Sequence, residues 1–132
     1  MTTSILIVED ESIVAVDLQE SLLGCGYDAY AIVDTGEDAI RQVSLRCPDV
    51  VLMDIRIRGL RDGIETAGIL RDRFDVPIIY LTAHTDTSTL QRAKATEPYG
   101  YLVKPIRMAE LRSTIEMTLD RRAIERRQPR DR

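Results

Sequence analysis

VVLMD, at residues 50–54, is the segment from which the architecture of this chain can be worked out. Its four apolar residues have no polar interruption, which is typical of a strand that helices cover on both faces of a parallel sheet. A second such segment, ILIV, stands near the start of the chain at residues 5–8, and acidic residues again follow directly, Glu9 and Asp10. Two strands of this kind predict an α/β fold with a central parallel sheet.

Strand-like and helix-like segments alternate along the rest of the chain. Further strands are predicted at residues 27–33, 77–81 and 99–103. The helices are predicted from Ser12 to about Gly24, at 36–46, from about 63 to Leu70 or beyond, at 86–95, and from Met108 onward. Ser12 is expected to cap the first helix, and Pro129 marks the latest end of the last one. This alternation implies right-handed crossovers and helices on both faces of one sheet.

The size and composition of the chain are those of one soluble domain. It has 132 residues, of which 44% are hydrophobic and 30% are charged. No apolar run approaches the roughly 20 residues that span a bilayer, and no basic segment precedes the first apolar run. We therefore expect a cytoplasmic protein without membrane contact. The two cysteines, Cys25 and Cys47, form neither a metal-binding pair nor a redox motif.

Charge is unevenly distributed along the chain. The net charge is −4, but the segment from Asp120 to Arg132 holds six arginines against three acidic residues. A net negative charge argues against direct binding of nucleic acid by the domain. We expect a main domain at residues 1–120, followed at 121–132 by an extension of the last helix that forms a basic tail or linker.

Polar residues of restricted kinds follow four of the predicted strands. They are Glu9 and Asp10 after the first strand, Asp54 after the third, Thr82 after the fourth and Lys104 after the fifth. The carboxyl ends of parallel strands lie along one edge of the sheet, where ligands bind, so we expect these side chains to converge. Polar residues also end many strands that have no function, and it is the combination of types that is informative.

This combination suits phosphoryl transfer assisted by a metal ion. Carboxylates a few ångströms apart repel each other unless one is protonated or a cation binds between them. Oxygen ligands with open coordination positions suit Mg²⁺, which keeps several waters and accepts a phosphate oxygen as a further ligand. A hydroxyl and an ammonium group stabilise the outer oxygens of a phosphoryl group, and an aspartate can be the nucleophile that receives it.

The same residues resemble the receiver domains of two-component response regulators. The resemblance extends to about Leu119, and its motifs are the acidic pair after residues 5–8, Asp54 after residues 51–53, LTA at 81–83 and VKP at 103–105. It implies a flavodoxin-like, doubly wound sheet of five parallel strands in the order 2-1-3-4-5, with five helices. It also implies a phosphoacceptor that is not an enzyme in the usual sense but promotes its own phosphorylation and dephosphorylation.

The resemblance implies how the metal and the phosphoryl group are held. Asp54 is the phosphoacceptor, which receives its phosphoryl group from a histidine kinase. Mg²⁺, with Mn²⁺ as an alternative, is bound by Asp10, by Asp54 and by the backbone carbonyl of Arg56. Glu9 binds the metal through a water molecule.

The resemblance also implies a switch at the fourth and fifth strands. Lys104 pairs with the acceptor and later with the phosphoryl oxygens. Thr82 moves toward the phosphoryl group after transfer, and the rotamer of Tyr101 follows that movement. Without the resemblance, the preferred interpretation of Tyr101 is a strand aromatic that packs on a helix. The bond between Lys104 and Pro105 is expected to be cis on the resemblance alone, since most such bonds are trans.

The loop after the acceptor departs from the family pattern. Arg58 stands where the family often has proline, and the segment 54–63 looks one residue longer. Arg56 and His84 each lie two positions beyond a site residue, where the family varies and where the lifetime of the phosphorylated form is tuned. We expect Arg56 to shield or steer the attacking water; for His84, an exposed loop residue is the alternative to a role in proton transfer.

The implied partners are proteins. In the family, the face made by the fourth helix, fifth strand and fifth helix usually carries the signal after phosphorylation. A sensor histidine kinase or a phosphotransfer protein is the expected phosphodonor, and a homodimer through that face or through the extension of the last helix stays open. The sequence does not identify the kinase, the output or the phosphorylation lifetime.

Three other functions are alternatives to the receiver. A receiver-like interaction module that is no longer phosphorylated would keep the fold, but the complete set of site residues argues against it. A Mg²⁺-dependent phosphohydrolase of the haloacid dehalogenase kind also uses an aspartate nucleophile, yet it needs a second acid where this chain has Arg56. A flavodoxin-type cofactor protein is disfavoured because the chain lacks a loop that cradles phosphate.

Overall fold

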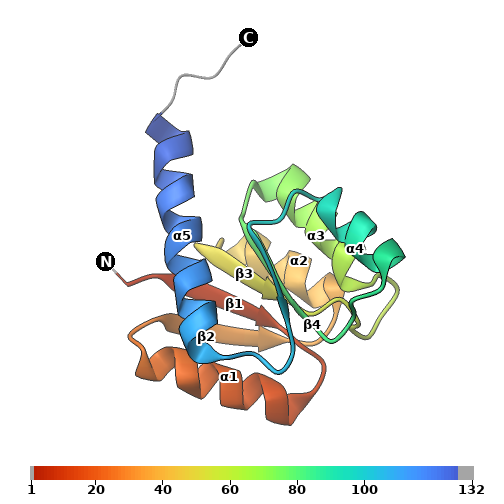
Figure 1. The fold of residues 1–132 in the computed structure, drawn as a ribbon, viewed down its shortest axis with the longest axis horizontal. Helices are drawn as coiled ribbons and strands as arrows, with labels where there is room; N and C mark the ends of the chain where they lie inside the picture. Colours follow the sequence, from red (N-terminus) through yellow and green to blue (C-terminus); the bar gives the residue numbers. More distant parts are fainter. Residues whose placement is uncertain (1, 128–132) are drawn as a thin grey trace.

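Five short, mainly apolar segments pair into one parallel sheet in a computed structural model, which describes residues 2–127 (Figure 1). The strands are β1 (Ser4–Val8), β2 (Asp28–Val33), β3 (Val50–Met53), β4 (Ile78–Thr82) and β5 (Gly100–Val103). Their order is β2-β1-β3-β4-β5, and every neighbouring pair is parallel. The predicted α/β class and strand order are confirmed. Three strands begin one residue later than predicted, at Asp28, Ile78 and Gly100.

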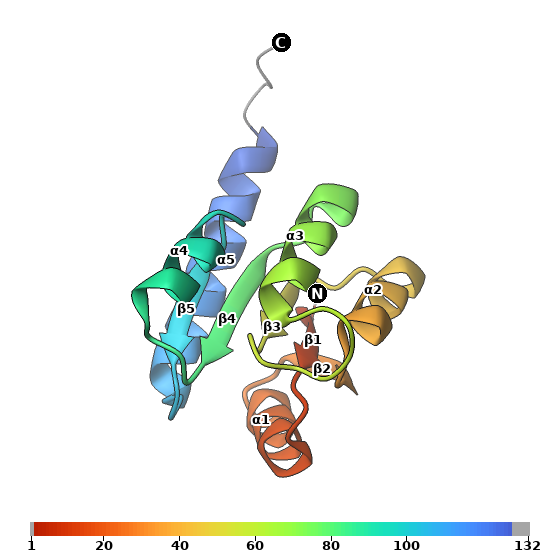
Figure 2. The ribbon, with the colours of Figure 1, turned by 90° about the vertical axis from the view of Figure 1, so that its right-hand side faces the viewer.

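Helices cover both faces of the sheet, as predicted. They are α1 (Ser12–Gly24), α2 (Gly36–Leu45), α3 (Gly63–Phe74), α4 (Thr87–Lys94) and α5 (Met108–Arg127). On one face, α2, α3 and α4 pack on β-strand side chains such as Val51 and Tyr80. On the other, α1 and α5 pack on side chains such as Ile7 and Leu52. Figure 2 shows the same layers after a quarter turn. No helix among residues 2–127 is long and apolar enough to cross a bilayer.

The start of α1 differs from the prediction. Glu11, and not Ser12, is the N-cap, and its side chain makes no capping hydrogen bond. The reason is that the carboxylate of Glu9 accepts a hydrogen bond of 3.1 Å from the Glu11 amide. This contact fixes the extended backbone at Glu11, so the helix begins at the next residue.

The last helix continues past the predicted domain boundary at residue 120. Leu111 and Ile115 are fully buried, whereas Ala123 and the four residues after it are exposed. Arg122 ties this part of α5 to the body of the domain through an ion pair of 3.2 Å with Asp75. The shallow burial of the extension therefore agrees with the prediction as far as Arg127, while Pro129 lies outside the described residues.

Candidate functional site

Strand register places the acidic residues of the predicted site side by side. Val8 and Met53, the last residues of β1 and β3, are partners across the ladder. Glu9 and Asp10 therefore leave the sheet next to Asp54. All three belong to the edge where the carboxyl ends of the strands meet.

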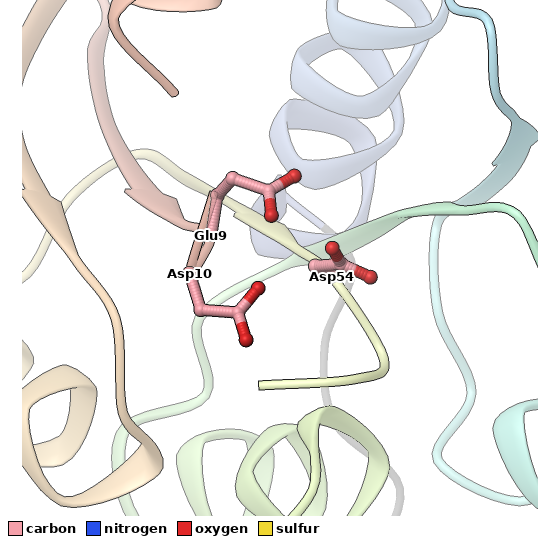
Figure 3. Close-up of side chains that lie close together, drawn as sticks. All are labelled: Glu9, Asp10 and Asp54. Atoms are coloured by element: carbon pink, nitrogen blue, oxygen red, sulfur yellow. The ribbon is translucent and has the colours of Figure 1, made fainter. Parts of the chain in front are cut away.

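The three carboxylates form a tight cluster (Figure 3). Each offers an oxygen that lies within 4.8 Å of the others. Glu9 and Asp54 are only 5% and 7% exposed, and Asp10 is half-buried. Such close, poorly solvated negative charges repel one another strongly, which makes the cluster unfavourable unless a proton or a cation offsets the charge.

Lys104 supplies part of the opposing charge. Its Nζ atom donates hydrogen bonds to Glu9 Oε1 at 2.6 Å and to Asp54 Oδ2 at 2.9 Å. Burial by itself disfavours the ammonium, but these two bonds outweigh it and raise the pKa of Lys104. Burial also raises the pKa of Glu9. The hydrogen bond from Lys104 lowers this pKa in part, and the neighbouring Asp54 raises it further.

The charge and chemistry of the cluster fit a hard divalent cation. Three carboxylates face one ammonium, so the ionised cluster carries two uncompensated negative charges. Oxygen is the only kind of ligand atom that the acids offer, which suits Mg²⁺ or Mn²⁺. Arg56 adjoins the cluster through its backbone, since its amide donates to Asp54 Oδ1 at 3.3 Å, while its side chain is exposed.

Thr82 and Tyr101 are joined to each other through His84. The hydroxyl of Thr82 is fully buried and accepts a hydrogen bond of 3.1 Å from the His84 amide. The hydroxyl of Tyr101 donates to the His84 carbonyl at 2.5 Å, and its ring packs edge-on against Tyr80. Within the part of the chain that the structure describes, Thr82 makes no side-chain hydrogen bond to Asp54 or Lys104.

Sequence reasoning missed two features of this edge. The first is the contact between Glu9 and Lys104, which join the sheet at β1 and β5 with two strands between them. The second is the role of the His84 backbone, because the sequence draws attention to its side chain. That side chain is half-buried, and not fully exposed as the simpler interpretation held. The bond between Lys104 and Pro105 is cis, as the resemblance implies.

Comparison with known proteins agrees with the fold. The chain is 34% identical over 117 residues to the transcriptional regulatory protein PdtaR of Mycobacterium tuberculosis, which covers 89% of this chain and 57% of PdtaR. It is 29% identical over 120 residues to the phyllosphere-induced regulator PhyR of Methylorubrum extorquens, covering 90% of this chain and 44% of PhyR. The chain thus spans about half the length of these curated relatives.

Solved structures show the same likeness. The signal receiver domain of a modulated diguanylate cyclase from Desulfovibrio desulfuricans G20 matches with a TM-score of 0.90 and 39% identity, over 95% of this chain and 99% of that one. The N-terminal domain of a response regulator, sensory box and GGDEF protein from Carboxydothermus hydrogenoformans matches with a TM-score of 0.83 and 33% identity, over 92% and 98%. Residues 5–116 match the response regulator receiver domain family. The chain therefore belongs to the receiver domains of two-component response regulators.

Proposed function

We propose that Asp54 accepts a phosphoryl group from a protein phosphohistidine, in a reaction that needs Mg²⁺ or Mn²⁺. Receiver domains are phosphoacceptor signalling domains and not classical enzymes. The observation that carries the proposal for this chain is the surroundings of Asp54: a buried carboxylate with an ammonium at 2.9 Å and two further acids beside it. A buried carboxylate next to an ammonium group and a potential metal site is a suitable nucleophile for a phosphorylated donor.

The proposed transfer requires little more than position and charge. A carboxylate oxygen of Asp54 forms a bond to phosphorus while the bond between phosphorus and the donor's imidazole nitrogen breaks. The bonding electrons leave with the imidazole, which takes a proton from solvent. Lys104 shifts from Asp54 toward the phosphoryl oxygens and offsets their charge.

The metal would be held by the acids on the other side of the cluster. Asp10, Asp54 and the backbone carbonyl of Arg56 are the proposed direct ligands, and Glu9 is the proposed ligand through water. When bound, the dication neutralises charge on the phosphoryl oxygens. Glu9 also holds Lys104 at 2.6 Å, so the same acid positions the ammonium for the reaction.

The proposed switch runs through His84. For the Thr82 hydroxyl to reach a phosphoryl group on Asp54, it must release the His84 amide that it now holds. The Tyr101 hydroxyl donates to the carbonyl of His84, so the rotamer of Tyr101 is expected to change when His84 moves. For the lifetime of the phosphorylated state, we propose that the Arg56 side chain screens the attacking water and that His84 is a second position of control. An unchanged dephosphorylation rate in Arg56→Ala would remove the proposed role of Arg56.

The proposed phosphodonor is a sensor histidine kinase or a phosphotransfer protein. Response regulators of two-component systems interact with histidine kinases. An apolar groove of about 570 Å³ next to Lys104 supports docking of a protein, because Val14 and Leu18 of α1 and Ile106 and Met108 line it. Helix α5, which continues to Arg127, is proposed to lead toward a further domain or a second copy of the chain.

Phosphorylation by a small donor tests the chemistry directly. Wild type, Asp54→Asn and Asp72→Asn are incubated with acetyl phosphate and Mg²⁺, and the intact mass is measured. The exposed Asp72 is the matched control. We expect one phosphoryl group on wild type and Asp72→Asn, none on Asp54→Asn, and none on wild type when EDTA replaces Mg²⁺. Labelling of Asp54→Asn to the wild-type level, or failure to label wild type, would overturn the proposal.

A further inference from the structure

The loop between β3 and α3 presents one leucine to solvent. In this loop, which is yellow-green in Figure 2, Ile55 is 4% exposed and Ile57 packs against the core. Leu60, a few residues further on, is 92% exposed. The loop therefore buries two of its apolar residues and leaves the third without any cover in the domain.

The exposure of Leu60 is fixed by contacts of the backbone. Its amide donates to Glu37 Oε1 at 3.1 Å, and the preceding Gly59 has a φ of +100°, with both Glu37 oxygens 3.1 Å from where a Cβ would lie. Just before this turn, Arg58 forms a parallel bridge with Thr35. The carboxylate of Glu37 and these backbone contacts hold a tight turn that points Leu60 away from the core. Because the backbone is already held, covering Leu60 orders only its side chain and not the loop.

Arginines lie close to this leucine in the sequence. Residues 55–61 contain Arg56, Arg58 and Arg61 and no acidic residue. In the region from residue 2 to 127, none of the three makes an ion pair with a carboxylate. A single exposed leucine is common on protein surfaces and means little alone. A leucine on a fixed turn, with arginines next to it in the chain that make no ion pair in the described residues, fits a partner surface with an apolar recess and an acidic rim.

The loop adjoins the proposed phosphoacceptor. Arg58 lines a hollow of about 340 Å³ together with Glu9 and Asp10, and the Arg56 amide donates to Asp54 itself. A protein that brings a phosphohistidine to Asp54 must therefore approach this loop. A specific interface involves roughly 20 residues on each side, which is wide enough to reach Leu60 from Asp54.

We propose that Leu60, flanked by Arg58 and Arg61, is an anchor for the protein phosphodonor. This inference rests on the proposed function of Asp54. Leu60 inserts into an apolar recess of the donor, and the arginines pair with acidic residues around that recess. The anchor contributes to docking and not to the chemical step, so transfer from a small phosphodonor does not depend on it.

Comparison of a protein donor with a small donor tests the anchor. The histidine kinases encoded by the source organism are purified, labelled with radioactive ATP and presented to wild type, and the donor with the highest kcat/KM is used further. Leu60→Ala and Arg58→Ala are compared with Leu45→Ala, which removes a 76% exposed leucine from the far end of α2. Because Leu60 is so exposed, Leu60→Ala is expected to fold normally, which its melting temperature checks.

The outcomes separate the anchor from the underlying chemistry. We expect kcat/KM with the kinase to fall roughly ten-fold or more in Leu60→Ala and to stay at the wild-type level in Leu45→Ala. Arg58→Ala should weaken the dependence of the rate on salt. Labelling by acetyl phosphate should be the same in Leu60→Ala and Leu45→Ala as in wild type. Wild-type transfer to Leu60→Ala overturns the anchor but not the phosphoacceptor, whereas wild type that acetyl phosphate cannot label overturns the proposed function itself. Loss of a wild-type self-association in Leu60→Ala would assign the loop to a second copy of the chain and overturn the donor as its partner.

Discussion

Replacement of Lys104 by methionine tests whether the acids and the lysine form one electrostatic unit. Methionine keeps most of the side-chain length and removes the charge that lies 2.6 Å from Glu9 and 2.9 Å from Asp54. At an effective dielectric constant of about 20, each contact represents roughly 6 kcal/mol of attraction. Desolvation of the three groups offsets most of it, and removal of one partner from a buried pair generally costs about 3–5 kcal/mol. Since the Lys104 side chain is 21% exposed, we expect a loss of about 2–4 kcal/mol.

The effect of pH and metal on this variant gives the sharper test. Burial raises the pKa of Glu9 above 4.5, so the ionisation of Glu9 opposes folding as the pH rises past that value. Without Lys104 this opposition grows, and the loss of stability should be larger near pH 8 than near pH 5. Mg²⁺ at about 100 times its dissociation constant should restore up to about 2.7 kcal/mol.

Urea unfolding followed by circular dichroism measures these changes, first in EDTA and then in Mg²⁺. Lys94→Met, which removes the same charge from an exposed position on α4, is the control. Equal unfolding midpoints for Lys104→Met and Lys94→Met, or a deficit that does not change between pH 5 and pH 8, would refute the reasoning.

Three further changes test the framework around the site. Asp62→Ala removes the capping box of α3 and an ion pair of 2.8 Å with Arg92, so thermal unfolding should show a loss of about 1–2 kcal/mol; an unchanged melting temperature would contradict this. Gly63→Ala would place its Cβ 2.0 Å from a backbone carbonyl oxygen and should cost about 1–3 kcal/mol in urea unfolding. Gly68→Ala on the same helix, where a Cβ would meet only Thr96 Cγ2 at an ordinary 3.9 Å, should not destabilise. Burial raises the pKa of Tyr80 to about 12, so the stability that the neutral Tyr80 side chain contributes is complete below about pH 10 and is lost as the pH rises toward 12. The free energy of unfolding of Tyr80→Phe, measured in urea, should therefore fall less than that of wild type over this range.

The sheet and the convergence of the acids follow from local patterns in the sequence. Residues 5–8 and 50–53 have no polar position, which is typical of a strand covered on both faces. Parallel pairing then fixes which ends meet, so Glu9, Asp10 and Asp54 come together without any detail of side-chain geometry. The starts of three strands were predicted one residue early because Tyr27, Pro77 and Tyr99 extend the apolar pattern, although each strand begins at the next residue.

The contacts that orient the site depend on positions far apart in the sequence, and no local pattern contains them. Glu9 and Lys104 are separated by 95 positions. Glu37, on α2, accepts a hydrogen bond from the backbone of Leu60 in the loop between β3 and α3. The cap of α1 was predicted at Ser12 from its residue type. The carboxylate of Glu9 instead accepts a hydrogen bond from the Glu11 amide, and Glu11 is the cap. Such choices follow from side-chain rotamers and competing hydrogen bonds, which residue preferences alone do not determine.

In the proposed switch, the acidic cluster is coupled to α4 through the segment around His84, which two side chains hold. Thr82 holds the amide of His84 and Tyr101 holds its carbonyl. If Thr82 turns toward a phosphoryl group on Asp54, one of these bonds breaks and the segment loses half of its restraint. The same segment leads within two residues to Asp86, whose side chain caps α4. We therefore propose that a change of charge at Asp54 reaches the start of α4 through this segment, and that a partner at the α4 face distinguishes the resulting backbone states.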